Sequence, residues 1–180
     1  MRKVFCLMLI TLLGATNLPA ATLAGVTLPD SAKVGDQTLV LNGMGLISKM
    51  GMKVYVTGLY LTQKSSDGAA IINADAPKRI VLHFMREVDH NKLKKNIGGE
   101  FDANAKATLK PQIEQFTSGF ETLNAGEEMA FTYFPGTGTT LTVKGKDKVT
   151  IPGLPFGQAV FGIWLGAKSP SSLKKGMLGQ

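Results

Sequence analysis

The side chains that usually perform catalysis or bind metals are few in this 180-residue sequence. It contains two histidines and one cysteine. An ordinary zinc site needs four ligands, which one cysteine and two histidines do not supply, so we predict no structural metal. His83 is expected mid-strand on the same face as Val81, which is typical of a packed histidine. His90 follows Asp89 at a predicted helix start and is expected to be solvated.

The motifs of the common enzyme classes are missing from the sequence. There is no G-x-S-x-G nucleophile elbow, P-loop, H-E-x-x-H or C-x-x-C. Gly136 and Gly138 fall in a predicted hairpin without the third glycine of a dinucleotide site, so no cofactor is predicted. Lys92, Lys94 and Lys95 form a basic stretch without interleaved aromatic residues, which indicates a solvated helix face and not nucleic-acid binding. Contact of this face with an anionic membrane surface or an acidic partner is the alternative.

The first twenty residues have the pattern of a secretory signal peptide. Arg2 and Lys3 precede a 12-residue apolar run, residues 4–15, and small residues follow. This run is shorter than the roughly 20 apolar residues that cross a bilayer, and no later segment is expected to span one, so no transmembrane segment is predicted. Cleavage is expected after Ala20, with Ala24 as the alternative. The mature chain, residues 21–180, would then be periplasmic or secreted and, without Cys6, would contain no thiol.

Composition indicates one folded domain. The chain is 44% apolar and 18% charged with a net charge of +7, which excludes a disordered protein. A chain of this length has a sizeable core and needs no disulfide to hold it.

The pattern of apolar residues and turn signals predicts the elements that must position any site. Helices are expected after Asp67, after Asp89, over residues 108–123 and over residues 155–165, and residues 42–45 (NGMG) are expected to form a turn. Because strands and helices do not alternate regularly, the order predicts an α+β domain with an antiparallel sheet covered on one side by helices. The strands are expected at residues 26–28, 38–42, 52–61, 78–85, 129–134, 139–143 and 149–151.

Residues 42–47 (NGMGLI) lead into residues 53–61 (KVYVTGLYL), and residues 158–166 (QAVFGIWLG) are followed by a Ser-Pro pair. The first two segments are similar to a glycine-x-glycine-x-arginine loop and a K-V-Y-x-x-G-x-Y-L strand, and the last resembles an A-V-x-x-x-x-x-G helix. Together with residues 77–86, they resemble the chalcone isomerase-like family from about residue 25 to the end, most closely its secreted bacterial branch. This resemblance implies an open-faced β-sandwich in which a large antiparallel sheet packs against helices.

The resemblance also implies two functions. Plant members of the family close a chalcone ring into a flavanone, with an arginine that stabilises the enolate; other members hold a fatty acid whose carboxylate meets an arginine and a tyrosine. The arginine position falls on Ile47. The threonine of the isomerase strand falls on Tyr55, which is the residue type of the fatty-acid-binding branch. The helix pattern Y-x-x-K-x-x-x-N falls on Lys92, Lys95 and Gly99, which keeps only the lysine.

These replacements favour a non-catalytic domain that binds a small apolar or fatty-acid-like ligand between sheet and helices. Loss of one donor that stabilises developing charge costs roughly 3 to 4 kcal/mol in catalysis, and here several are lost. Lys49 is expected either to share the face of Ile47 and approach an anionic headgroup, or to be a solvated turn residue. The predicted ligand contacts are Ile47, Lys49, Tyr55 and Lys95.

Two further alternatives follow from the sequence. The first is an intramolecular isomerase or lyase that acts on an enone through Lys49, Lys95 and Tyr55. The second concerns the methionines at positions 44, 50, 52 and 85, which either fill the core or line an adaptable apolar cavity.

Overall fold

A seven-stranded antiparallel sheet forms the centre of the computed structural model, which describes residues 20–180. Strands that follow each other in the chain are neighbours in the sheet. A separate two-stranded hairpin precedes it, β1 (Ala20–Leu23) with β2 (Val26–Pro29). The sheet strands are β3 (Ser31–Val34), β4 (Gln37–Lys49), β5 (Met52–Leu61), β6 (Lys78–Phe84), β7 (Glu128–Phe134), β8 (Gly138–Val143) and β9 (Lys146–Ile151).

The predicted signal peptide lies outside the described residues apart from Ala20. Strand β1 occupies the chain between the two predicted cleavage positions, Ala20 and Ala24. Cleavage after Ala20 would retain most of this strand, whereas cleavage after Ala24 would remove it.

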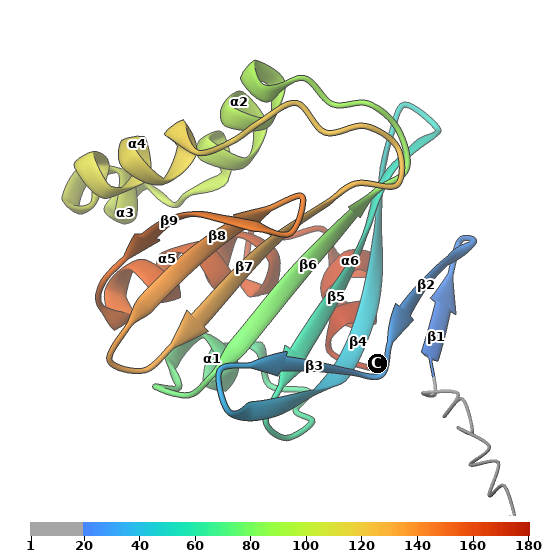
Figure 1. Ribbon diagram of the computed structural model, residues 1–180, viewed down its shortest axis with the longest axis horizontal. Helices are drawn as coiled ribbons and strands as arrows, with labels where there is room; N and C mark the ends of the chain where they lie inside the picture. Colours follow the sequence, from blue (N-terminus) through green and yellow to red (C-terminus); the bar gives the residue numbers. More distant parts are fainter. Residues whose placement is uncertain (1–19) are drawn as a thin grey trace, which may run out of the picture.

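Six helices cover one face and one edge of the sheet within residues 20–180 (Figure 1). Asp67, Asp89 and Asp102 begin three of them, because each carboxylate accepts hydrogen bonds from backbone N–H groups of the first turn. No helix of residues 20–180 is long and apolar enough to cross a membrane. The helices are α1 (Gly68–Asn73), α2 (His90–Glu100), α3 (Ala103–Thr108), α4 (Lys110–Ser118), α5 (Leu154–Leu165) and α6 (Ser171–Met177).

The main core lies between the sheet and these helices. Along β6, Ile80, Leu82 and Phe84 face this core, while Val81 between them packs in a smaller cluster on the outer face. A third cluster, which includes Leu28, forms where β1 and β2 pack beside the sheet. The predicted α+β class, with an antiparallel sheet packed against helices, is therefore confirmed.

The predicted turn at residues 42–45 is wrong, because these residues lie inside β4. Helix α6 packs directly against this part of the strand: a Cβ on Gly43 would lie 2.2 Å from the Gly176 carbonyl oxygen, and one on Gly176 would lie 2.3 Å from the Met44 carbonyl oxygen. Asn42 fixes the same contact, since its Nδ2 donates to the Met177 carbonyl at 2.8 Å. The asparagine and glycines that resembled turn residues therefore allow a helix to lie close to a strand.

The single helix predicted over residues 108–123 is also wrong in extent. Residues 103–118 form two helices, α3 and α4, and α4 ends before Gly119. A Cβ at Gly119 would lie 2.9 Å from Cδ2 of Leu141, so the chain approaches the sheet closely at this point. Leu123 continues as an isolated antiparallel bridge to Val88. Apolar residues continue at the same spacing after α4 because Phe120 and Leu123 still face the core.

Candidate ligand-binding pocket

A pocket of about 320 Å³ lies on the helix-covered face, where β4 ends and β5 begins. Strands β4, β5 and β6 form its floor, and α2, α5 and α6 form its walls. Its polar groups belong to Lys49, Tyr55, Asn96, Glu100 and Lys168. Its apolar lining comes mainly from Ile47, Val54, Phe84, Val88, Leu93, Ile97, Ile163, Trp164 and Leu173.

Strand register places three lining residues in one row. Ile47 pairs with Tyr55 across β4 and β5, and Tyr55 pairs with Phe84 across β5 and β6. Residues directly opposite each other on paired strands project to the same face, so the three side chains meet at the pocket floor. The rings of Tyr55 and Phe84 are 5.6 Å apart between centroids. A register shift follows Ile47, and Lys49 beyond it also lines the pocket.

The Tyr55 hydroxyl is the polar centre of the pocket. Trp164 of α5 donates its Nε1–H to this oxygen at 3.2 Å. Burial raises the pKa of Tyr55 to about 12 against the opposing effect of this hydrogen bond, and the charge of Glu100 acts in the same direction as burial. The phenol therefore stays protonated at neutral pH and retains a hydrogen to donate.

The other two tyrosines of the chain show what is unusual about Tyr55. Tyr60 donates its hydroxyl hydrogen to the Pro29 carbonyl at 2.9 Å, and Tyr133 donates to Oδ1 of Asp75. Within residues 20–180, the Tyr55 hydroxyl only accepts, and its own hydrogen has no acceptor. A partly buried hydroxyl that faces a pocket with an unused hydrogen is suited to a ligand oxygen.

Charged side chains surround the mouth of the pocket and not its floor. Lys49 and Lys168 are exposed, and so is Glu100. At the floor, where the resemblance places an arginine, the apolar side chain of Ile47 is found. The deep part of the pocket thus offers a neutral hydrogen-bond donor, and the cations are available only nearer to solvent.

Lys95 does not belong with the other predicted contacts. It is exposed on α2 and does not line the pocket, whereas Ile47, Lys49 and Tyr55 do. The helical repeat explains the difference, because Leu93 and Ile97 face inward and residue 95 lies on the opposite side of the helix.

Among the lining residues that were not predicted as ligand contacts, four carry polar side-chain groups: Asn96, Glu100, Trp164 and Lys168. The first two share the face of Leu93 and Ile97 at helical spacing, so the apolar stripe of α2 contained the signal for them. Trp164 falls in the helix predicted over residues 155–165, but its hydrogen bond joins residues 109 positions apart in the chain, which no local pattern reveals.

The pocket is not lined by the two histidines or by the methionines at positions 44, 50, 52 and 85. Met50 and Met52 are exposed at the β4–β5 turn. Met44 and Met85 pack against the third cluster, the one that includes Leu28. Nδ1 of His83 lies 3.0 Å from Oε1 of Glu128. Within residues 20–180, no group of three or more histidine, cysteine, aspartate or glutamate side chains is arranged to hold a metal ion.

A larger hollow of about 480 Å³ lies between α3 and α5. It shares Glu100 and Lys168 with the Tyr55 pocket, but its wall carries more polar groups. Two of these polar groups are already hydrogen-bonded, because Nε2 of Gln158 donates to Oδ1 of Asn73 at 3.3 Å. The Tyr55 pocket is therefore the better candidate for an apolar ligand, because it combines apolar walls with one unused donor.

Comparisons with known proteins identify the family and the fold of this chain. The family model described as chalcone isomerase-like matches residues 20–179. The crystal structure of a fatty-acid binding protein from Arabidopsis thaliana is similar, with a TM-score of 0.72 and 16% sequence identity over 89% of this chain and 96% of that chain. No curated protein matches the chain. At this identity the structural similarity shows a shared fold, and the family match covers nearly all described residues, so the chain belongs to the chalcone isomerase-like family.

Proposed function

We propose that this protein is an exported, non-catalytic binding protein for a small apolar or fatty-acid-like ligand, which it holds between sheet and helices. The observation that carries the proposal is the Tyr55 hydroxyl, which Trp164 orients and whose hydrogen is unused among residues 20–180. A structurally similar protein is named as a fatty-acid binding protein, which supports the same ligand class.

The position of the charges suggests how such a ligand would lie. The apolar tail would contact Ile47, Phe84 and Leu173, and an oxygen of the head would accept from Tyr55. A charged carboxylate is costly at an apolar floor without a cation, so its second oxygen would be oriented towards Lys49 and Lys168 at the mouth. At about 320 Å³ the pocket is near the lower end of the range for small-molecule sites, which favours a small ligand.

Extraction of the natively purified protein, followed by mass spectrometry, tests whether a ligand is bound. We expect a reproducible apolar molecule, and we expect fatty acids of graded length to raise the melting temperature of the stripped protein through preferential binding to the folded state. A reproducibly empty protein whose melting temperature no lipid changes would refute the proposal.

Ile47→Arg tests the orientation of the head group. Restoring a cation at the floor should strengthen binding of a fatty acid relative to the alcohol of the same length, because only the acid carries a charge for the arginine. Equal changes for both ligands would show that the head lies elsewhere.

The isomerase or lyase alternative draws support from the same phenol, because a protonated Tyr55 could donate to a developing enolate. A panel of chalcone-like enones checks it. Turnover that is lost in Tyr55→Phe would establish the enzyme and overturn the non-catalytic proposal.

Export is tested separately by fractionation of the native cells and amino-terminal sequencing of the mature protein. We expect a periplasmic or secreted chain that begins at Ala21, or at Gly25 if cleavage follows Ala24. A chain found only in the cytoplasm with Met1 retained would contradict export.

A further inference from the structure

The turn between β4 and β5 carries two exposed methionines. Met50 is 90% exposed and Met52 is 50% exposed, and they are the large hydrophobic residues most open to solvent among those described. Figure 1 shows this hairpin projecting beyond the end of the sheet, near the connection from β6 to α2. Nothing within residues 20–180 covers the Met50 side chain, so packing of the fold does not explain it.

The backbone at Met50 makes this choice of residue more unusual. Met50 has φ 52° and Gly51 has φ 78°, the left-handed pair of a two-residue hairpin turn. The first position of such a turn favours asparagine, aspartate or glycine, which tolerate this conformation. A methionine here is both strained and exposed, which points to a role outside folding.

Cations surround the two methionines. Lys49, Arg86 and Lys92 line a small hollow with Met50 and Met52, and Lys53 is exposed beside them. Nη1 of Arg86 lies 3.0 Å from Sδ of Met52. The hollow also contains one carboxylate, Glu87. Among residues 20–180, none of these four cations lies within ion-pair distance of a carboxylate.

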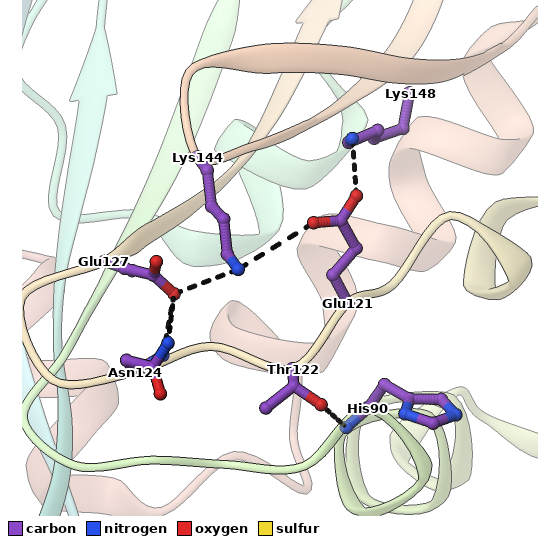
Figure 2. Close-up of polar contacts among 7 residues, drawn as sticks. All are labelled: His90, Glu121, Thr122, Asn124, Glu127, Lys144 and Lys148. Atoms are coloured by element: carbon purple, nitrogen blue, oxygen red, sulfur yellow. Dashed lines mark hydrogen bonds and ion pairs between the residues drawn. The ribbon is translucent and has the colours of Figure 1, made fainter.

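The β8–β9 turn has the same backbone but the opposite character. Lys144 has φ 52° and Gly145 has φ 73°. Figure 2 shows that Lys144 lies between Glu121 and Glu127, with Nζ 3.2 Å from the Glu127 carboxylate, and that Lys148 contacts Glu121. Lys144 and Lys148 beside this second turn are neutralised, whereas the lysines at the β4–β5 turn are available to an anion.

We propose that the β4–β5 turn docks on the surface of an anionic lipid bilayer. Met50 and Met52 would enter the boundary between headgroups and acyl chains, while Lys49, Lys53, Arg86 and Lys92 would contact the acidic headgroups; this combination of apolar tip and basic rim is typical of interfacial binding. The sequence had suggested the basic face of α2 for such contact, and only Lys92 of that face is part of this surface.

The β4–β5 turn lies beside the Tyr55 pocket. Lys49, Val54, Val88 and Asn96 line both the small hollow at the turn and the Tyr55 pocket. A bilayer bound at the turn would therefore lie beside the mouth of the pocket, where an apolar molecule could pass between them. Docking itself does not depend on the proposed ligand.

Co-sedimentation of the full mature chain with vesicles tests the proposal. We expect binding to vesicles of phosphatidylcholine and phosphatidylglycerol in equal amounts, weaker binding to phosphatidylcholine alone, and weakening by salt. Lys53→Gln/Lys92→Gln should lower the partition coefficient roughly 25-fold, since each cation near an anionic surface contributes on the order of fivefold. Met50→Ser/Met52→Ser should lower it on the order of tenfold through lost apolar burial.

Lys144→Gln/Lys148→Gln is the matched control, because it removes the same charge at the equivalent turn and should change binding little. Tyr55→Phe should bind vesicles as the wild type does, so failure of docking and failure of ligand binding are separable. The proposal is wrong if the vesicles do not bind, if both vesicle types bind equally, or if the control weakens binding as much as Lys53→Gln/Lys92→Gln does. Self-association through the turn that Met50→Ser abolishes, with no vesicle binding, would overturn it in favour of a dimer.

Discussion

The two ends of the helix-covered face differ in how they are filled. At the closed end, beneath α4 and α5, the ring of Phe116 lies 5.9 Å from that of Phe131 and 5.0 Å from that of Phe156. At the open end, around Tyr55, a mixture of aliphatic and aromatic side chains leaves a pocket of about 320 Å³. Trp164 divides the two, since its ring lies 4.9 Å from Phe131 and its N–H bonds to Tyr55. One continuous sheet thus supports a solid core and a binding space, and the side chains decide which forms.

The largest expected effect of a mutation is at the closed end. Phe116→Ala should lower the free energy of unfolding by about 3–5 kcal/mol, because it leaves a cavity among rings that cannot collapse onto it. Ile47→Ala, at a half-buried position beside existing space, should cost less than about 2 kcal/mol. Denaturant unfolding of the two variants measures the difference. Equal losses would show that the open end is packed as tightly as the closed one.

Lys78 offers a second comparison, because this cation is buried on the closed side while the cations of the open end are exposed. It is 1% exposed, and its Nζ donates to the carbonyls of Ile71, Ile72 and Ala74 at 2.7–3.1 Å, at the end of α1. Lys78→Met would leave these buried acceptors unpaired and should cost about 1–3 kcal/mol. Lys53→Gln is the control at the open end and should change unfolding by less than about 0.5 kcal/mol.

The pH dependence of unfolding provides an independent check on Lys78. Burial lowers its pKa to about 8, although the charge of Asp75 opposes this. Between about pH 8 and pH 10 the unfolded chain binds more protons at this lysine than the folded chain, so stability should rise with pH. Lys78→Met should lack that rise. Above pH 10 the raised pKa of Tyr55 and Tyr60, each about 12, reverses the slope in both proteins. Identical slopes below pH 10 would contradict the burial of a charged lysine.

The smallest expected change in stability distinguishes the β4–β5 turn from the β8–β9 turn. Met50→Asn should stabilise the protein by up to about 1 kcal/mol, because asparagine tolerates the left-handed conformation better. Lys144→Asn gains the same relief but loses its contacts with Glu121 and Glu127, each worth about 0.2–1 kcal/mol, so it should be close to neutral. Thermal melting measures both. Destabilisation by Met50→Asn would show that Met50 has a structural role.

Much of the closed end was predictable from local patterns. The spacing of Leu109, Ile113 and Phe116 predicted which of these residues face the core, because helical periodicity reports burial directly. The same periodicity predicted a helix that extends beyond the end of α4, because residues after Gly119 remain buried without being helical.

The open end was less predictable because it depends on contacts between distant segments. The strand of Tyr55 and its resemblance to the fatty-acid-binding branch pointed to this region, and Ile47 and Lys49 line the same pocket. Trp164 and Lys168 reach it from later parts of the chain, so spacing along the sequence did not reveal them. Lys95 was chosen by motif alignment, whereas the inward stripe of α2 excludes it.

Calorimetric titration of stripped protein with the extracted ligand, comparing Tyr55→Phe with Tyr60→Phe, tests the central claim most directly. Tyr55→Phe removes a donor whose hydrogen is unused in the ligand-free protein, whereas Tyr60→Phe removes a donor already bonded to Pro29 on the other face. We predict that Tyr55→Phe raises the Kd about 3- to 10-fold, the value of one hydrogen bond, and that Tyr60→Phe leaves it unchanged. An unchanged Kd in Tyr55→Phe, or equal losses in both variants, would contradict the proposed function.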